Sequence, residues 1–581
     1  MDTPINITRT ERVDDIPLLL AQMGKMNIAA LLDKHFPMHG NWQGLSLGQI
    51  VVVWLAYILS EGDHRLNSVQ GWVAGILMTL SICLKAAGLR ELDFSDDRMA
   101  VVVEMPGQDA PWEAYESEQG GVLLRVYDLK ARRVRLDSST VKSYVAVTED
   151  GLFQLGHSKE RRPDLPQLKI SLSVLDPLGM PLTTTPSSAA NARTTRGMCR
   201  KCAKSRRASG GMACPMWATA KWRRPAPAPT SRRTGTITCA RCLRCRCRRR
   251  RCKPCPDPSG RADSRQSPCT ARPRRKPNQP EHIADGFSHT VTLAADGEGN
   301  RIEWQEQRLA VRSLKQAASQ EKALEARLGK AEKAMAGLNL RGRGRKCLDE
   351  DGMRGAADSI LEHYDVAGLL AVEIARETQA THKRAYGKRA AHTVTAATFT
   401  ARASRDAVAC AEAVRGLGWR VFACNDLELS LAEAVLAYRE QYIIERGFNR
   451  LRGKTLGITP LFLSSTTRIK GLVRLLSIAL RVLCLVEFAV RKALQEEGAK
   501  LDGIYAGNPK RATARPTTEM MLIAFRGLNL IVINVNEVDR YCMTALNAVQ
   551  MRILGLIGFP PAIYQGIEMQ SGKPATKMGK P

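Results

Sequence analysis

The stretch 430–454 constrains the fold of this chain more than any other part of the sequence. It is written SLAEAVLAYREQYIIERGFNRLRGK and opens with an S-x-x-E capping box at Ser430 and Glu433, after which no Pro or Gly occurs until Gly447. Apolar residues recur in it at helical spacing and predict a buried stripe: Leu436, Ile443, Ile444, Phe448 and Leu451. We therefore expect one long helix over this stretch.

A second stripe of the same helix carries polar groups. Tyr438 is followed three, seven and fourteen residues later by Gln441, Glu445 and Arg452. At about 100° per residue these offsets return close to one face, so a carboxylate stands between an aromatic hydroxyl and a guanidinium. Composition alone favours a solvated charged face, which is the usual fate of such residues.

This polar stripe resembles the signature Y-x2-R-x3-E-x6-K of a large class of DDE transposases from bacterial insertion sequences, with Gln441 in place of Arg and Arg452 in place of Lys. Other stretches resemble the same family: NWQGLSLGQIVVVWLAYILSEGDHRLN, VRLDSSTV, GHSKERRPDLPQLK and LDPLGMPL. The resemblance covers roughly residues 10–185 and 280–565.

The resemblance implies an α/β fold: an RNase H-like mixed-sheet core with a helical N-terminal region and an insertion domain. It implies metal-dependent DNA cleavage and strand transfer at the ends of an insertion sequence. The partners would be double-stranded DNA, as terminal inverted repeats and target, and a second copy of the chain in a homodimer on DNA. No membrane partner is implied.

The family's site residues are carried over by position. Asp137, in VRLDSSTV, and Glu445 are the first and last metal-binding carboxylates, with Mg²⁺ (or Mn²⁺) as the cofactor, because this ion prefers carboxylate and water oxygens. Tyr438 and Arg452 would hold DNA phosphates near the cut, and three further cations would add charge that positions the DNA: Arg446, Arg450 and Lys454. His157 and Lys159 in GHSK are either substrate contacts or parts of a polar loop.

Charge points to the same class of partner. The chain of 581 residues has a formal net charge of +30 and a pI near 9.8, which favours nucleic acid over membrane as the ligand. The N-terminus is polar, with no signal peptide, and the most apolar run, 471–490, carries Arg474, Arg481 and Glu487 and is expected to be a core helix. We expect a cytoplasmic, nucleoid-associated bacterial protein.

Residues 186–277 depart from everything around them. They hold 26 Lys and Arg, two Asp and ten of the 16 Cys, a net charge of +24 that leaves +6 for the rest of the chain. Three interpretations compete. The C-x2-C pairs among Cys239–255 could bind zinc, the Arg run could grip phosphates as a disordered arm, or the segment is GC-rich DNA translated out of frame.

The codon table tests the third interpretation. Residues 216–222, MWATAKW, must be encoded ATG TGG GCN ACN GCN AAR TGG, and the frame two bases later forces Val-Gly and permits Asp-Gly-Lys-Met. The result resembles the family's segment around its second catalytic Asp, and the same shift over residues 186–198 permits a family-like VVSGERADDPWYV. The lost Asp would be encoded across codons 218 and 219, where this protein has Thr219. We therefore expect a disabled transposase. The alternatives are a DNA-binding remnant without catalysis and a zinc-dependent nucleic-acid-binding protein.

The patterns predict six regions: 1–105 helical, with a possible role in binding DNA ends; 106–185 first part of the core; 186–277 irregular or disordered; 278–415 insertion; 416–497 second part of the core; 498–581 linker and C-terminal region. Strands are expected at 122–128, 132–137, 168–176, from 180, 392–403 and 419–424, with a hairpin turning at 296–300. Helices are expected over 306–336, within 356–390 and over 467–495.

Overall fold

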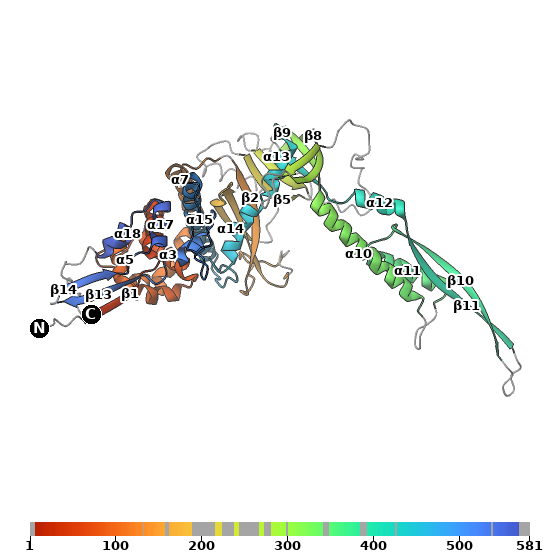
Figure 1. Cartoon of the computed structure of the whole chain (residues 1–581), viewed down its shortest axis with the longest axis horizontal. Coiled ribbons are helices and arrows are strands. Elements are labelled where there is room, and N and C mark those ends of the chain that lie inside the picture. The colour runs from red at the N-terminus through yellow and green to blue at the C-terminus, as the bar shows by residue number, and fades with distance from the viewer. Residues whose placement is uncertain are drawn as a thin grey trace.

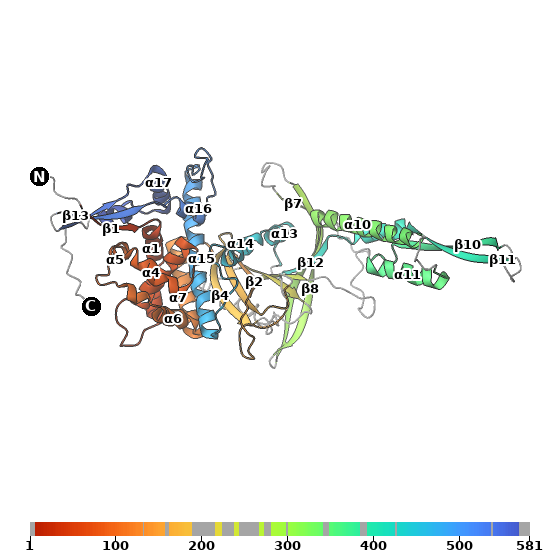
Figure 2. The ribbon, with the colours of Figure 1, turned by 90° about the horizontal axis from the view of Figure 1, so that it is seen from below.

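The computed structural model describes residues 6–131, 133–156, 162–188, 215–222, 237–242, 267–271, 281–297, 300–340, 348–383, 392–424, 427–535 and 538–568. Three parts follow one another along the long axis (Figures 1 and 2): helices from both ends of the chain, a mixed sheet in the middle, and an arm of helices and two long strands. The fold therefore combines helices and sheets, as expected for the α/β class. His157 and Lys159 lie outside the described residues.

The first part is mainly helical. Its first half contains β1 (Asn6–Arg12), α1 (Ile16–Lys25), α2 (Ile28–His35), α3 (Leu47–Glu61), η1 (Leu66–Ser68), α4 (Val69–Ala74), α5 (Leu77–Leu84), η2 (Glu91–Phe94), α6 (Asp96–Glu104), η3 (Met105–Gly107) and α7 (Asp109–Val126). The capping box expected at Ser46 and Gln49 is present and opens α3. The strand expected at 122–128 is wrong, because that apolar run continues α7 and buries Leu123 in the helical core.

The C-terminal part of the chain completes this helical part. It contributes α15 (Thr466–Glu496), α16 (Thr518–Ile523), β13 (Asn529–Val535), β14 (Val538–Met543), α17 (Ala548–Ile557) and α18 (Ala562–Glu568). β13 lies between β1 and β14 in an antiparallel three-stranded sheet, which joins the two ends of the chain. Among the described residues, no single helix is both long and apolar enough to cross a membrane; only the bent pair Leu66–Ala74 with Leu77–Leu84 meets that test by length and composition.

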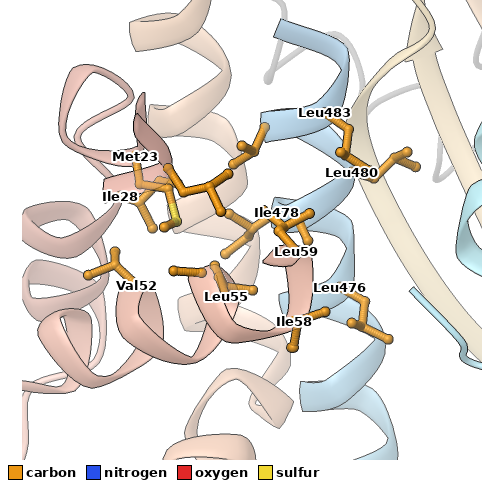
Figure 3. Close-up of a cluster of buried hydrophobic side chains, with 14 of the residues drawn as sticks. Met23, Ile28, Val52, Leu55, Ile58, Leu59, Leu476, Ile478, Leu480 and Leu483 are labelled. Carbon is orange, nitrogen blue, oxygen red and sulfur yellow. The ribbon is translucent and has the colours of Figure 1, made fainter. Parts of the chain in front are cut away.

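Helix α15 is the centre of the main core. Its middle is buried on all sides, between the N-terminal helices and the mixed sheet, as expected for the run 471–490. Figure 3 shows Leu59 of α3 beside Ile478 of α15, while Leu476, Leu480 and Leu483 lie on the side of α15 that faces the sheet. One hydrophobic cluster therefore joins the helical part to the first strands of the mixed sheet.

The mixed sheet has the strand order β4-β3-β2-β5-β6-β12-β9-β8-β7. Its strands are β2 (Val134–Lys142), β3 (Gln167–Leu175), β4 (Met180–Ser188), β5 (Pro215–Trp222), β6 (Ile237–Cys242), β7 (Ser267–Ala271), β8 (Glu281–Gly297), β9 (Asn300–Ser313) and β12 (Trp419–Cys424). β2 is antiparallel to β3 and parallel to β5, and β5 is parallel to β6. The predicted strands at β2, β3, β4 and β12 and the β8–β9 hairpin are confirmed.

The expectation that 186–277 is irregular is wrong for three short stretches, because β5, β6 and β7 come from this segment. β5 and β6 fill the place between β2 and β12, where each of those strands would otherwise leave a row of backbone groups without a partner. The Trp and Thr residues of β5 are compatible with a strand.

The arm contains α10 (Leu314–Leu338), α11 (Glu350–His363), β10 (Leu370–Lys383), β11 (His392–Arg405) and α12 (Ala407–Arg415). Two expectations are corrected here. Residues 306–313 belong to β9 and not to the helix that follows, since they pair with β8 and β12. Residues 370–383 are a strand and not a helix, because β10 pairs with β11 over its whole length.

Candidate active site

Asp137 lies in β2, a strand with neighbours on both sides, and is half-buried. Its partner across the antiparallel pair with β3 is Leu172, and directly opposed residues of such a pair point to the same face of the sheet. A Cβ placed on Gly447 of α14 (Tyr442–Arg452) would lie 3.9 Å from Cδ1 of Leu172. Asp137 therefore projects from the sheet face that α14 covers, and α14 is the helix that carries Glu445.

The long helix expected over 430–454 is two helices, α13 (Leu431–Arg439) and α14, separated at Glu440 and Gln441. The capping box of Ser430 and Glu433 is present. The break lies where Arg135 of β2 donates to the carbonyl of Ala437, which would otherwise accept from the backbone N–H of Gln441 in a continuous helix. That N–H instead donates to Tyr438, one residue nearer.

The break also corrects the buried stripe. Ile443, Ile444, Phe448 and Leu451 are buried as expected, but Leu436 is 37% exposed. It lies on α13, whose buried face is Ala434, Val435 and Ala437. Because residues 440 and 441 lie outside both helices, α13 and α14 do not share one continuous helical repeat. The apolar stripe that is buried on α14 therefore does not continue as the buried face of α13.

Two contacts fix how α14 runs along β2. Near its start, Arg135 donates to Glu440 with 2.9 Å between Nη2 and Oε2. Beyond its end, the Ser143 hydroxyl donates to the carbonyl of Leu461 at 2.6 Å, and the Leu461 N–H donates to the Lys142 carbonyl at 3.3 Å. Helix and strand therefore run in the same direction, side by side.

Both carboxylate positions follow the Arg135–Glu440 ion pair along this direction. Asp137 is two strand residues beyond Arg135, about 7 Å along β2. Glu445 is three residues beyond Tyr442, the first residue of α14, about 4.5 Å along the helix. Glu445 is exposed in the first turn of α14 and lies outside its buried face of Ile443, Ile444, Gly447, Phe448 and Leu451.

Thr219, the position of the expected lost Asp, lies in β5, the strand that pairs with β2 on the side away from β3. β2 and β5 are parallel, with Val134 opposite Met216, Arg135 opposite Trp217 and Leu136 opposite Ala218. Asp137 and Thr219 are the next residue on each strand. The printed pairing ends at Leu136 and Ala218, so the role of position 219 stays a prediction from the codon argument.

The residues present fit a divalent cation only in part. Asp137 and Glu445 offer carboxylate oxygens, which Mg²⁺ prefers, but the third position is Thr and supplies no carboxylate. Within the part of the chain that the structure describes, no three His, Cys, Asp or Glu side chains come together as a metal site.

The five residues expected to contact DNA have different surroundings. The ring of Tyr438 packs on Phe422, with 4.6 Å between ring centroids, and Arg452 is half-buried with Nε 3.5 Å from the Phe448 carbonyl. Lys454 is exposed. Arg446 is partly exposed and pairs with Glu487 of α15.

Arg450 is 7% exposed and its guanidinium is held by two carboxylates. It donates to both oxygens of Glu519 at 2.8 Å, and also to Glu487. Burial lowers the pKa of Arg450, but the nearby carboxylates have the larger combined effect and raise that pKa. Burial raises the pKa of Glu519, but the charge of Arg450 and its hydrogen bond have the larger combined effect and lower that pKa. This network connects α14 to α15 and α16. The charge of Arg450 is used within the fold, so Arg450 is not among the proposed DNA contacts.

Sequence reasoning missed the side chains that position the site. Arg135 is buried between Asp176 and Glu440 and fixes the break between α13 and α14, with Arg133 beside it. The only sequence signal was a basic residue at an inward position of a strand, two places before Asp137. Glu487 was noticed only as a charge that argues against a membrane span.

A loop from the N-terminal region also reaches the end of α14. A Cβ on Gly62 would lie 3.2 Å from the Lys454 carbonyl, and one on Gly457 would lie 3.7 Å from Nδ1 of His64. Tyr57 donates to Asp63 at 2.7 Å, and Asp63 also accepts from Arg65. Burial raises the pKa of Asp63, but these hydrogen bonds outweigh it and hold the pKa at about 2. The loop is thus an ordered support for α14.

No protein-family profile and no curated protein sequence matches this chain. Among solved structures, the chain is similar to a piggyBac transposase, in a synaptic complex with hairpin DNA, over 83% of this chain and 74% of that chain. The sequence identity is 7% and the TM-score 0.28, so this similarity carries no argument about the site.

Proposed function

We propose that this chain is a DDE-type DNA transposase of a bacterial insertion sequence, with an RNase H-like catalytic core, in which catalysis is disabled at position 219. One observation supports the proposal: Asp137 projects from the sheet face that α14 covers, and α14 is the helix that carries Glu445. The sequence signature assigns these two residues to the first and last of the three carboxylates, and position 219 follows Ala218, the last residue of β5 that pairs with β2.

The mixed sheet supports the proposal. β2 carries Asp137 between an antiparallel neighbour and a parallel one, and this mixture is what an RNase H-like core requires of its first strand. A parallel neighbour in turn requires a crossover, and here residues 189–214 connect β4 to β5. If 186–277 is out of frame, the frameshift has replaced this connection together with the sequences of β5, β6 and β7.

The chemistry explains why the third position matters. Cleavage of a phosphodiester by this class of site uses two divalent metal ions about 3.5–4 Å apart, one activating the nucleophile and one stabilising the leaving oxygen. We propose Mg²⁺ or Mn²⁺ as the metal, duplex DNA with terminal inverted repeats as the substrate, and a homodimer as the active assembly. Asp137 and Glu445 alone leave the ligand set one carboxylate short, so we derive no catalytic step for this chain.

The test compares the chain as written with one translated from a gene in which the frame of codons 186–277 is restored. Both are incubated with Mg²⁺ and a duplex that carries the element's ends, and cleaved strands are separated by size. We expect cleavage only by the restored chain, and its loss in Asp137→Asn and Glu445→Gln versions of that chain. Cleavage by the chain as written would refute the proposed inactivation, and a restored chain that folds but never cleaves would refute the transposase assignment.

A second candidate function is DNA binding without catalysis. It is favoured by the net charge of +30 of the chain as written, of which +24 lies in residues 186–277. Binding by the chain as written, with no cleavage at any metal concentration, separates this function from the enzyme. The zinc-binding interpretation concerns Cys239–255, which lie largely outside the described residues, and it stays a prediction that zinc analysis of the purified protein tests.

A further inference from the structure

The strands β10 and β11 form a two-stranded antiparallel ribbon that extends past the helices of the arm. Figure 1 shows both strands continuing beyond the end of α11, and Figure 2 shows the same from below. The register is unbroken from the pair Leu370–Arg405 to the pair Lys383–His392. An isolated two-stranded ribbon is only marginally stable in water, so its outer half calls for an explanation.

The base of the ribbon is firmly held. Val372, Ile374, Phe399 and Ala401 pack with a cluster of α10 and α11 that contains Met335, Met353 and Ala357. Asn339 at the end of α10 bonds both backbone groups of Ala401, with Nδ2 to the carbonyl and the N–H to Oδ1, each at 2.8 Å. Arg405 pairs with Glu325 and Glu332 of α10. These contacts hold the base of the ribbon in a fixed orientation on α10 and α11.

The outer half has no such cover. From Arg376 to Lys383 the strand is about 24 Å long. Among the residues of this stretch whose side chains are described, Thr398 and Phe399 are half-buried and the others are exposed: Arg376, Glu377, Thr378, Ala380, His382, Thr393 and Ala397. Most are small, so this part of the ribbon stays thin.

The charge of the outer half is mainly positive. Residues 376–399 contain five Lys and Arg and one Glu, Glu377, while Arg402 and Arg405 belong to the base, where Arg405 pairs with two carboxylates. A thin basic ribbon matches the major groove of duplex DNA, which is about 12 Å wide and admits a two-stranded β-ribbon. We propose that the outer half of the β10–β11 ribbon inserts into the major groove of duplex DNA and is a DNA contact separate from the candidate active site. The choice of DNA as the ligand rests on the proposed function.

The first experiment locates the contact. The photo-reactive amino acid p-benzoylphenylalanine is placed at Ala380 or Thr393 in the full chain, and at Val408 of α12 as a control that is 77% exposed near the ribbon's base. Each protein is irradiated with a 30-base-pair duplex of arbitrary sequence, without metal. We expect several-fold more cross-linked DNA from the two ribbon positions than from Val408, and competition by methyl green, a major-groove ligand. Equal yields at all three positions, competition by a minor-groove ligand alone, or cross-links to a second copy of the chain would overturn the proposal.

The second experiment removes the outer half. Arg376 and Phe399 are paired in register, so residues 377–398 can be replaced by Asn-Gly, a two-residue turn that closes an antiparallel hairpin. The change removes four Lys and Arg and one Glu. We expect affinity for the same duplex to fall about tenfold and the slope of log affinity against log salt to fall by about three to four. An unchanged slope in a variant with unchanged thermal unfolding would overturn the proposal.

Neither readout needs a metal or a complete ligand set. If the ribbon did not cross-link to DNA but the frame-restored chain cleaved it, the ribbon proposal would be wrong and the proposed function would stand. If the ribbon cross-linked to DNA but the frame-restored chain did not cleave it, the proposed function would be wrong and the ribbon would still be a DNA contact.

Discussion

Arg135 of β2 and Glu440 form an ion pair, 2.9 Å between Nη2 and Oε2, at the point where α13 ends and α14 begins. The same guanidinium bonds Asp176 and the carbonyl of Ala437. This one side chain therefore ties the break between α13 and α14 to β2, the strand that carries Asp137.

Loss of Arg135 should be costly. In Arg135→Met, Asp176 keeps only the longer contact to Arg133, at 3.4 Å, and a buried carboxylate is left without its main partner. We expect the free energy of unfolding to fall by about 3–5 kcal/mol. Arg133→Met is the matched control, because that arginine is partly exposed and should cost at most about 1 kcal/mol. Urea unfolding measures both, and equal losses would contradict the role given to Arg135.

Arg450 and Lys454 should separate stability from DNA binding. Arg450→Ala leaves Glu487 and Glu519 without their shared partner, so we expect a loss of about 3 kcal/mol in stability but little change in DNA affinity of the folded protein. Lys454→Ala should leave stability unchanged and lower the salt slope of binding by about 1. Titration with a fluorescent duplex at several salt concentrations, beside urea unfolding, measures both. A weaker salt dependence in Arg450→Ala would show that its charge reaches DNA after all.

Gly471 should not tolerate a side chain. A Cβ at this position of α15 would lie 1.7 Å from the Val103 carbonyl, where helix and α6 approach backbone to backbone. Gly471→Ala should lose about 1–3 kcal/mol. Gly329→Ala in α10 is the control, since nothing lies within 4 Å of its Cβ and Ala favours a helix by about 0.5–1 kcal/mol. The midpoint of thermal unfolding should fall in Gly471→Ala and rise in Gly329→Ala. A shift in the same direction in both variants would contradict the close approach of α15 and α6.

Glu116 should make stability depend on pH. Burial raises the pKa of Glu116 to about 7 from its ordinary value of 4.5, although Arg481 beside it acts in the opposite direction. A raised pKa means that the folded state binds more protons than the unfolded state, so stability should fall as pH rises from about 4.5 to 7. Burial raises the pKa of Asp15 to about 6, which adds to the decline.

The measurement is urea unfolding at several pH values. Glu116→Gln should flatten the decline between pH 4.5 and 7, whereas Glu118→Gln should not, since ion pairing with Lys34 lowers the pKa of that exposed group. If both variants declined as the original protein does, the protonation of Glu116 would have no part in stability.

The sequence predicted correctly those elements whose causes lie within a few neighbouring residues. The capping boxes at Ser46 and Ser430 and the apolar run of α15 are signals within one helix, and each was found. The break at Glu440 could not be found in this way, because its cause is Arg135, about three hundred residues earlier in the chain. The strand β10 was missed for the same reason, since its Ala-rich sequence becomes a strand only by pairing with β11.

The candidate site was predicted mainly from the resemblance to a transposase family and less from the physical properties of its residues. Asp137 and Glu445 were named from motifs, and composition alone would have left them as a strand-end residue and a solvated charge. The structure adds what no motif contains: α14 covers the sheet face from which Asp137 projects, and β5 pairs with β2 as far as Leu136 and Ala218, the residues before Asp137 and Thr219. It also shows that Arg450, grouped with the DNA contacts by its charge, is held in the core.

The central claim is that Asp137, position 219 and Glu445 converge on one cation. The most direct measurement is Mn²⁺ binding, followed by electron paramagnetic resonance of the free ion, in the Thr219→Asp chain. We expect this substitution to create one site per chain, and expect either Asp137→Asn or Glu445→Gln added to it to abolish that site. If Thr219→Asp bound no more Mn²⁺ than the original chain, or if its site survived both added substitutions, the three positions would not meet and the account would be wrong.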